Sequence, residues 1–215
     1  MSKATKIRLR FAKGGDLRLA SHHDVMRCLE RMVRRGAIPV AASQGFSPRP
    51  KIVFALAMGL GIEGRREIVD FELTEPMEPS ELRDRLAAVS FPGFTWLDAE
   101  ALDAKASAPK PVWVEYDLPI PEGRRQAATA AAATLMASSS REVTRRRSDR
   151  DREVVFDMRP FLIDARITDE GVFRARLKVT PEGSVRPEEV LASLGIRDLL
   201  DDGAVLVRTH VELAP

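Results

Sequence analysis

A short stretch early in the chain gathers residue types that suit anion binding. The sequence AASQGFSPRPK, residues 41–51, holds a glycine, prolines, serines, an amide and cations in one turn. Glycine allows a backbone with positive φ, and proline stiffens the residues around it, so such a turn exposes N–H groups beside Arg49 and Lys51. We therefore expect this turn to contact phosphate. The competing interpretation is a rigid connection whose Phe46 fills the core.

A second polar group opens the first predicted helix. Ser21 is a good N-cap, and Asp24 follows at the third position after it. The N-terminus of a helix favours an anion, and His22 has the chemistry to hydrogen-bond a phosphate or base, or to act as a general acid. The alternative is simple capping beside solvated histidines. If the two stretches meet, the following side chains form one polar pocket: His22, Asp24, Ser43, Gln44, Arg49 and Lys51.

The same helix, residues 21–36, carries a basic face. Its apolar residues recur at helical spacing and Gly36 ends it, which leaves several arginines off the apolar stripe. Arginine makes bidentate contacts with phosphate, so this face predicts a nucleic-acid backbone as ligand, whereas a merely solvated face is the alternative. The predicted strand 6–13 adds Lys6, Arg8 and Arg10 on its outer side. The candidate RNA- or phosphate-binding residues are Ser21, His22, Asp24, Arg27, Arg34, Arg35, Ser43, Gln44, Gly45, Arg49 and Lys51.

The elements that must position these residues follow a pattern that occurs twice. Strands are predicted at 6–13, 38–43, 51–62, 66–75 and 94–102, and helices at 21–36 and 78–89. A small, proline-bearing stretch then precedes a second run of the same order, in which residues 145–152 form a charged hairpin tip and Ser184 caps a helix. The pattern predicts an α+β fold of two tandem ferredoxin-like (split βαβ) domains with antiparallel sheets. The boundaries are 1–102, a linker at 103–111, and 112–215.

Composition limits the classes of function. The chain has 215 residues and a formal net charge of +2, and Cys28 is its one cysteine, so a reducing compartment is expected and an internal disulfide is excluded. No apolar run reaches the length of a signal or membrane segment, so we expect a cytoplasmic protein without membrane contact. Because no P-loop, dinucleotide fingerprint, metal-binding histidine pair or nucleophile elbow occurs, we expect neither a bound metal nor catalysis by this chain alone.

Residues 10–64 closely resemble the start of the bacterial radical SAM-linked protein family, a domain of unknown function. The matching features include Ser21, His22 and Asp24 and the SQGFSPRPK stretch, and the later DMRPFL and VTPEGSVRPEEVLASLG also look like the family. The chain departs from the family at two positions. It has Ser47 where the family usually has asparagine, and Arg49 where the family usually has histidine.

The resemblance implies a partner and a setting. Genes of the family lie beside, or are fused to, a radical SAM enzyme, so S-adenosylmethionine and an iron–sulfur cluster are expected only in that partner. The leading hypothesis is an accessory RNA-binding or substrate-presenting partner of a radical SAM enzyme in tRNA or rRNA modification or maturation. One alternative is an RNA-processing enzyme that uses His22 as general acid or base. Another is a protein-interaction module that docks on the radical SAM partner without RNA.

Overall fold

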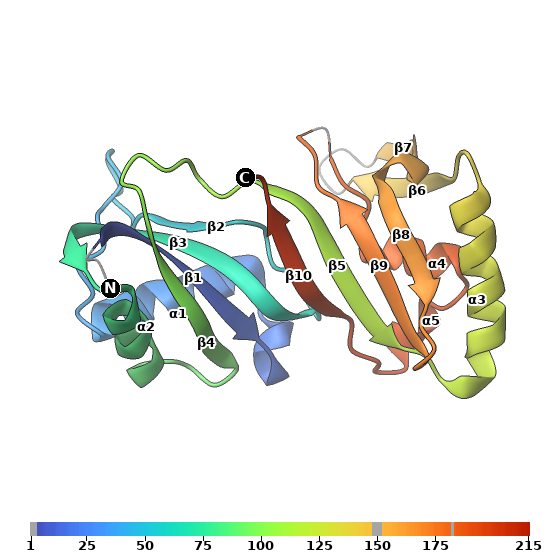
Figure 1. The fold of residues 1–215 in the computed structure, drawn as a ribbon, viewed down its shortest axis with the longest axis horizontal. Coiled ribbons are helices and arrows are strands. Elements are labelled where there is room, and N and C mark those ends of the chain that lie inside the picture. Colours follow the sequence, from blue (N-terminus) through green and yellow to red (C-terminus); the bar gives the residue numbers. More distant parts are fainter. Residues whose placement is uncertain (1–3, 148–151, 182) are drawn as a thin grey trace. The chain divides into compact units, whose positions relative to one another are not determined.

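The computed structural model describes residues 4–147, 152–181 and 183–215 and divides the chain into two compact units. The first comprises Met1–Pro111 with Arg208–Pro215, and the second comprises Val112–Val207. Both units combine helices with antiparallel strands, which confirms the predicted α+β class (Figure 1). In the described ranges, no helix has the length and apolar character needed to cross a membrane.

The first unit is built on a sheet in which β1 is central. β1 pairs antiparallel with both β3 and β4, while β2 and β10 also pair with β3. The elements are β1 (Ala4–Lys13), the 3₁₀ helix η1 (Gly15–Leu19), α1 (His22–Arg35), β2 (Ile52–Phe54), β3 (Glu63–Met77), α2 (Pro79–Ala88), β4 (Phe94–Leu102) and β10 (Val207–Leu213).

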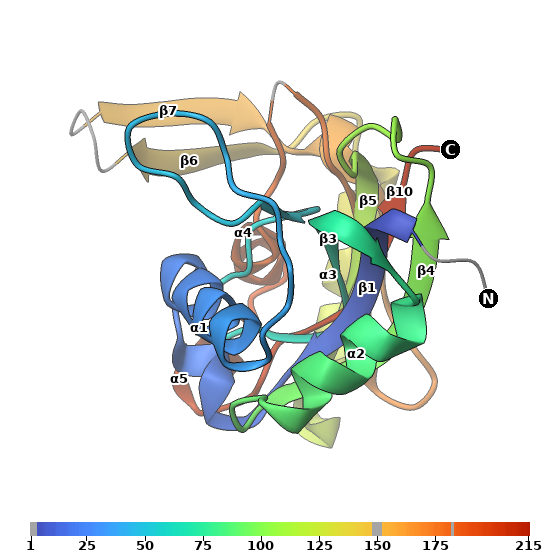
Figure 2. The ribbon, with the colours of Figure 1, turned by 90° about the vertical axis from the view of Figure 1, so that its left-hand side faces the viewer.

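The core of this unit lies between one face of the sheet and both long helices. Successive strand residues point to opposite faces, so alternate residues of β1 and β3 are buried against α1 and α2. Figure 2 shows the two helices on the same side of the sheet. The buried cluster includes Ile7, Leu9, Phe11, Val25, Leu29, Met32, Val69, Phe71, Leu82 and Leu86. This cluster fixes α1, and therefore its outward face.

The second unit has a sheet of order β5-β9-β8 and a separate hairpin of β6 and β7. The predicted charged tip at 145–152 coincides with the ends of β6 and β7, and its residues 148–151 lie outside the described residues. The elements are β5 (Pro111–Pro119), α3 (Glu122–Ala137), β6 (Glu142–Arg147), β7 (Arg152–Asp157), η2 (Arg159–Phe161), β8 (Leu162–Ile167), β9 (Val172–Lys178), α4 (Pro187–Ser193) and α5 (Asp198–Asp201).

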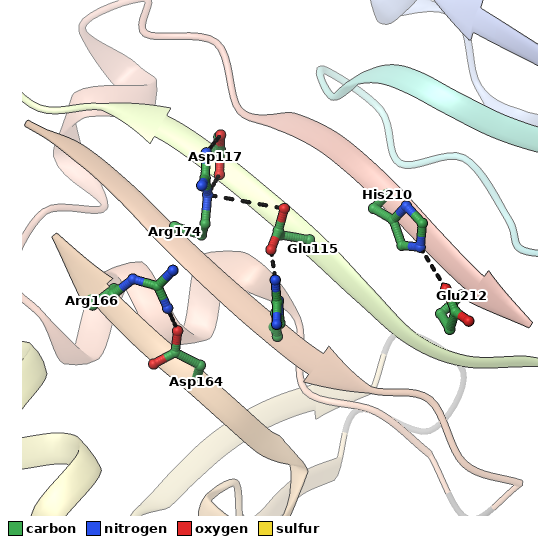
Figure 3. A network of polar contacts seen from close by, with 8 residues as sticks. Glu115, Asp117, Asp164, Arg166, Arg174, His210 and Glu212 are labelled. Carbon is green, nitrogen blue, oxygen red and sulfur yellow. Dashed lines mark hydrogen bonds and ion pairs between the residues drawn. The ribbon is translucent and has the colours of Figure 1, made fainter. Parts of the chain in front are cut away.

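One face of the β5-β9-β8 sheet carries a series of ion pairs (Figure 3). Arg174 donates to both carboxylate oxygens of Asp117, at 2.8 and 2.7 Å. Arg176 pairs with Glu115 at 2.7 Å, and Arg166 pairs with Asp164. The nearby Asp117 carboxylate raises the pKa of Arg174. Each of these arginines is therefore already matched to a carboxylate of the same sheet.

Several local predictions are wrong. Residues 38–43 form no strand, since only Val40 and Ala42 make isolated bridges, to Leu73 and Pro50. Pro39 removes a backbone donor within this segment, and Pro50 lacks one opposite Ala42, so a continuous ladder is not available to the segment. Of the predicted strand 51–62 only β2 pairs with β3, and β3 begins at Glu63, before the predicted start of its strand at residue 66.

Two predicted side-chain roles also differ. Arg8 does not belong to an open basic face, because its guanidinium donates to both oxygens of the buried Asp70, at 2.8 and 3.0 Å. The N-cap of α4 is Arg186 and not Ser184. Sequence alternation identified the outward side of β1. It did not identify the partner of Arg8, because Asp70 is 62 residues away in the chain.

Candidate functional site

The start of α1 is held by a reciprocal cap. The Ser21 hydroxyl accepts from the Asp24 backbone N–H at 3.2 Å and donates to the Asp24 carboxylate at 2.6 Å. This hydroxyl is also the main cause that lowers the pKa of Asp24. The predicted capping is therefore present. It also uses the polar groups of both residues, and it puts a carboxylate where a bound anion would lie.

Replacing Ser21 with alanine should lower the free energy of unfolding by about 1 kcal/mol, because the first turn of α1 loses its side-chain acceptor. Urea denaturation followed by circular dichroism measures the change. Ser47→Ala, on the exposed part of the following loop, is the matched control and should change stability by less than about 0.5 kcal/mol. Equal effects of the two substitutions would refute the cap assignment.

His22 is half-buried at the first position of α1. Its ring lies edge-on to Phe54, with 5.2 Å between the ring centroids. Its Nδ1 atom is buried and has no hydrogen-bond partner among the residues that the structure describes. Burial is the first cause that lowers the pKa of His22, and the charges of His23, Arg208 and Lys13 act in the same direction. The imidazole is therefore neutral at pH 7, a state that accepts a proton and does not supply one.

A group of buried charges near this histidine was missed by sequence reasoning. Arg208 of β10 donates to both oxygens of Glu67 on β3, at 2.8 and 2.5 Å, and to the Ala57 carbonyl at 3.1 Å. Lys13 is 1% exposed, donates to the Gly59 carbonyl at 3.1 Å, and has a pKa lowered chiefly by burial. Within the described ranges, no group of His, Cys, Asp and Glu side chains is arranged to hold a metal ion.

The segment between α1 and β2 is a loop closed at its base. The Ser43 N–H donates to the Arg49 carbonyl at 2.8 Å, and the Arg49 N–H donates to the Ser43 hydroxyl at 3.0 Å. Gln44, Gly45 and Phe46 are exposed at the tip, where Gly45 has a φ of 132°. Phe46 therefore does not fill the core, as one interpretation of the sequence expected. Figure 2 shows the loop as a wide arch after α1.

The loop and α1 meet at an open, polar cavity of about 350 Å³. Its lining brings Arg27 of α1 and Arg49 of the loop together, whereas the other residues of the pocket considered from the sequence do not line it. A smaller cavity of about 100 Å³ shares part of this lining and extends to Phe54. The larger cavity is lined by His23, Met26, Arg27, Glu30 and Arg49. His23 and Glu30 lie four and three residues from Arg27 on the same helix, so helical spacing was the sequence signal that could have placed them in the same site.

Lys51 lies apart from this cavity. Its Nζ pairs with Glu72 at 2.6 Å, and it lines a different cavity of about 160 Å³ with Lys6 and Asp70. Ile52 of β2 packs against the core cluster, so the alternation of the strand turns its neighbours to the other face of the sheet. The predicted single pocket that includes both His22 and Lys51 is therefore not formed.

The basic face of α1 is exposed along its length. Arg27, Arg31 and Arg34 are exposed and follow i, i+4, i+7 spacing, so they form one stripe that spans about 10 Å of helix axis. Nη1 of Arg27 lies 3.5 Å from Oδ1 of Asp24. Cζ of Arg35 lies over the Phe91 ring, 5.8 Å from its centroid. Among the described residues, Arg31, Arg34 and Arg49 take part in no ion pair. These cations are available to an external anion.

Comparisons with known proteins place the chain in a family. A search of curated proteins finds no match. The crystal structure of a Cbf5-Nop10-Gar1 complex contains a chain that is 12% identical, with a TM-score of 0.44; the match covers 96% of the present chain and 49%, about half, of that chain. A likeness at this level carries no argument about function. The family model described as "Uncharacterized protein conserved in bacteria (DUF2344)" matches residues 6–187, and the chain belongs to this family.

Proposed function

We propose that this chain is an accessory protein that binds RNA through its first unit. In this proposal the phosphates of the RNA lie along the arginine stripe of α1 and enter the cavity between Arg27 and Arg49. Arg34 and Arg35 extend the contact along the last turn of the helix. Ser21 and Asp24 orient α1, and Gln44 and Gly45 contribute from the loop.

The observation that carries the proposal is a group of exposed arginines on α1 and the following loop, most of which have no carboxylate partner among the described residues. Two of the group, Arg27 and Arg49, line one cavity, and Arg27 also lies 3.5 Å from Asp24. Elsewhere in the first unit, Arg66, Arg83 and Arg85 pair with Asp98, Asp84 and Glu81. On α1 and the following loop, Arg31, Arg34 and Arg49 take part in no ion pair among the described residues. Arginines that a protein does not neutralise itself are suited to bidentate contacts with phosphate. The lining of the cavity has Arg27 and Arg49 against one acid, Glu30, and Asp24 pairs with Arg27 from outside this lining.

The test is the affinity for RNA of a variant in which Arg27, Arg31 and Arg34 are all replaced by alanine. Filter binding at about 50 mM salt should show at least a tenfold weaker affinity for tRNA or rRNA fragments. Three phosphate contacts are lost, and such contacts contribute most at low salt. The slope of log affinity against log salt should also fall by about 2, since each contact to a single strand contributes about 0.7.

The matched control replaces Arg66, Arg83 and Arg85 with alanine. It removes the same charge from the same unit, but from arginines that are ion-paired. We expect its RNA affinity and salt slope to stay near those of the unmodified chain. Equal losses in both variants would show a net-charge effect, and no detectable binding by the unmodified chain at low salt would refute the proposal.

The proposed partner is a radical SAM enzyme, to which the chain would present its RNA. Only the resemblance of residues 10–64 to the radical SAM-linked family supports this step. Co-purification of the two proteins tests it, and treatment with ribonuclease separates a direct protein contact from one that RNA bridges. The RNA-processing alternative would use His22 as general acid or base and Lys51 or Arg49 to stabilise charge. Lys51 pairs with Glu72, so that role would fall to Arg49, and unchanged RNA cleavage by a His22→Ala variant would refute this alternative.

The proposed architecture is a pair of tandem ferredoxin-like domains. In the first unit, the order β1-α1-β2-β3-α2-β4 and the pairing of β1 between β3 and β4 support a split βαβ fold. In the second, β5, α3, the β8–β9 pair and α4 follow in the same order, with the β6–β7 hairpin inserted. The domain limits 1–102 and 112–215 stay predictions, as does the linker between them.

A further inference from the structure

The feature of the first unit that the proposed function leaves unused is the aromatic ring at the tip of the loop. Phe46 has a relative exposure of 111%, so its side chain touches almost nothing in the protein. A phenylalanine ring that stabilises a fold does so by burial, and this ring contributes none. Its position therefore calls for an explanation outside the fold of this chain.

The loop holds the ring outward from a fixed base. The two hydrogen bonds between Ser43 and Arg49 close the base, and the Lys51 N–H donates to the Ala41 carbonyl at 2.7 Å just below it. Gly45 has a φ of 132°, a conformation that side chains disfavour, although nothing lies within 4 Å of a Cβ placed there. Glycine is therefore required at position 45 by the backbone conformation of the turn before the ring, and not because a side chain would meet other atoms there.

The surroundings of the ring are polar and positively charged. Gln44 and Ser47 are exposed in the same loop, and Arg49 at the base of the loop lines the cavity that Arg27 also lines. A protein partner that buried the ring would also have to desolvate these polar groups. A nucleotide matches both the ring and the nearby arginines, because its base has an apolar face and its phosphate is an anion.

We propose that Phe46 stacks on an unpaired base of the RNA, so that the preferred ligand is single-stranded RNA and not a duplex. This inference rests on the proposed function. In an RNA duplex the faces of the bases are covered by their neighbours, whereas the bases of single strands and loops are free to stack on aromatic side chains. The phosphates beside the stacked base then lie toward Arg49 and the arginine stripe of α1.

The experiment measures fluorescence anisotropy with a labelled, unstructured RNA strand of about 12 nucleotides and with the same strand annealed to its complement. The unmodified chain should bind the single strand at least about tenfold more tightly than the duplex. Phe46→Ala should weaken single-strand binding by about tenfold and leave duplex binding unchanged. Phe46→Trp should restore the affinity, because the larger ring still stacks. Leu60→Ala removes another exposed apolar side chain, 67% exposed in the unmodified chain, and should have no effect.

The outcomes separate this inference from the proposed function. If Phe46→Ala binds the single strand as the unmodified chain does while the triple arginine variant binds weakly, RNA binding stands and stacking is wrong. Equal losses for single strand and duplex also overturn stacking. If Phe46→Ala leaves RNA affinity intact but abolishes binding to a protein partner, the ring is a protein contact. If the unmodified chain binds neither RNA, both proposals fail.

Discussion

Glu67→Gln is expected to lower the free energy of unfolding by about 3–5 kcal/mol, because it removes the charge that compensates a buried guanidinium. Arg208 and Glu67 are 3% and 4% exposed and are joined by two parallel hydrogen bonds. Glutamine keeps the size of the side chain, so the effect reports charge and hydrogen bonding and not lost packing. Urea denaturation followed by tryptophan fluorescence measures it.

The control for this prediction is an exposed pair changed in the same way. Arg66 and Asp98 are 2.7 Å apart, with 45% and 64% of their side chains exposed. Solvent screens such a pair, so Asp98→Asn should cost less than about 1 kcal/mol. If Glu67→Gln costs no more than Asp98→Asn, burial does not strengthen the pair as inferred.

Phe11→Ala should cost about 3–5 kcal/mol of stability, because it opens a cavity at the centre of the first unit. The ring is fully buried and has three aromatic neighbours, with centroids 6.0 Å from Phe54, 5.8 Å from Phe94 and 5.5 Å from Trp96. Phe54 in turn contacts His22, so loss of the Phe11 ring should also loosen the start of α1. Thermal and urea denaturation measure the loss.

Phe46→Ala is the matched control for Phe11→Ala, since it removes the same atoms from a fully exposed position. Its stability should change by less than about 0.5 kcal/mol. A similar loss in both variants would mean that the loop tip is packed in solution, and that would also remove the basis for a free stacking surface.

Elements whose stabilising contacts are periodic along the chain were predictable from sequence. The predicted helix 21–36 is α1 with Ser21 and Gly36 as its caps, and the predicted strand 94–102 is β4. In both, the apolar repeat marks the buried face, so the pattern contains the information needed. The exposed stripe of arginines on α1 follows from the same periodicity.

Features that depend on contacts distant in sequence were not predictable. The partner of Arg208 is 141 residues away, and no local pattern marks Glu67 as buried. Lys51 and Arg49 were both predicted to contact phosphate, but Lys51 forms an ion pair with Glu72 beside the β2–β3 pair. One interpretation of the sequence placed Phe46 in the core, because an aromatic residue in a sequence does not report its own exposure.

The hydrogen-bonded base of the loop has a consequence for engineering the length of the loop. Because Ser43 and Arg49 hold each other directly, residues 44–48 begin and end at adjacent points, and the strands beneath do not depend on what lies between. Doubling the length of such a loop costs only about 0.6 kcal/mol of closure entropy. The hydrogen bonds at the base should therefore allow an engineered loop of different length to close on the same scaffold without unfolding it.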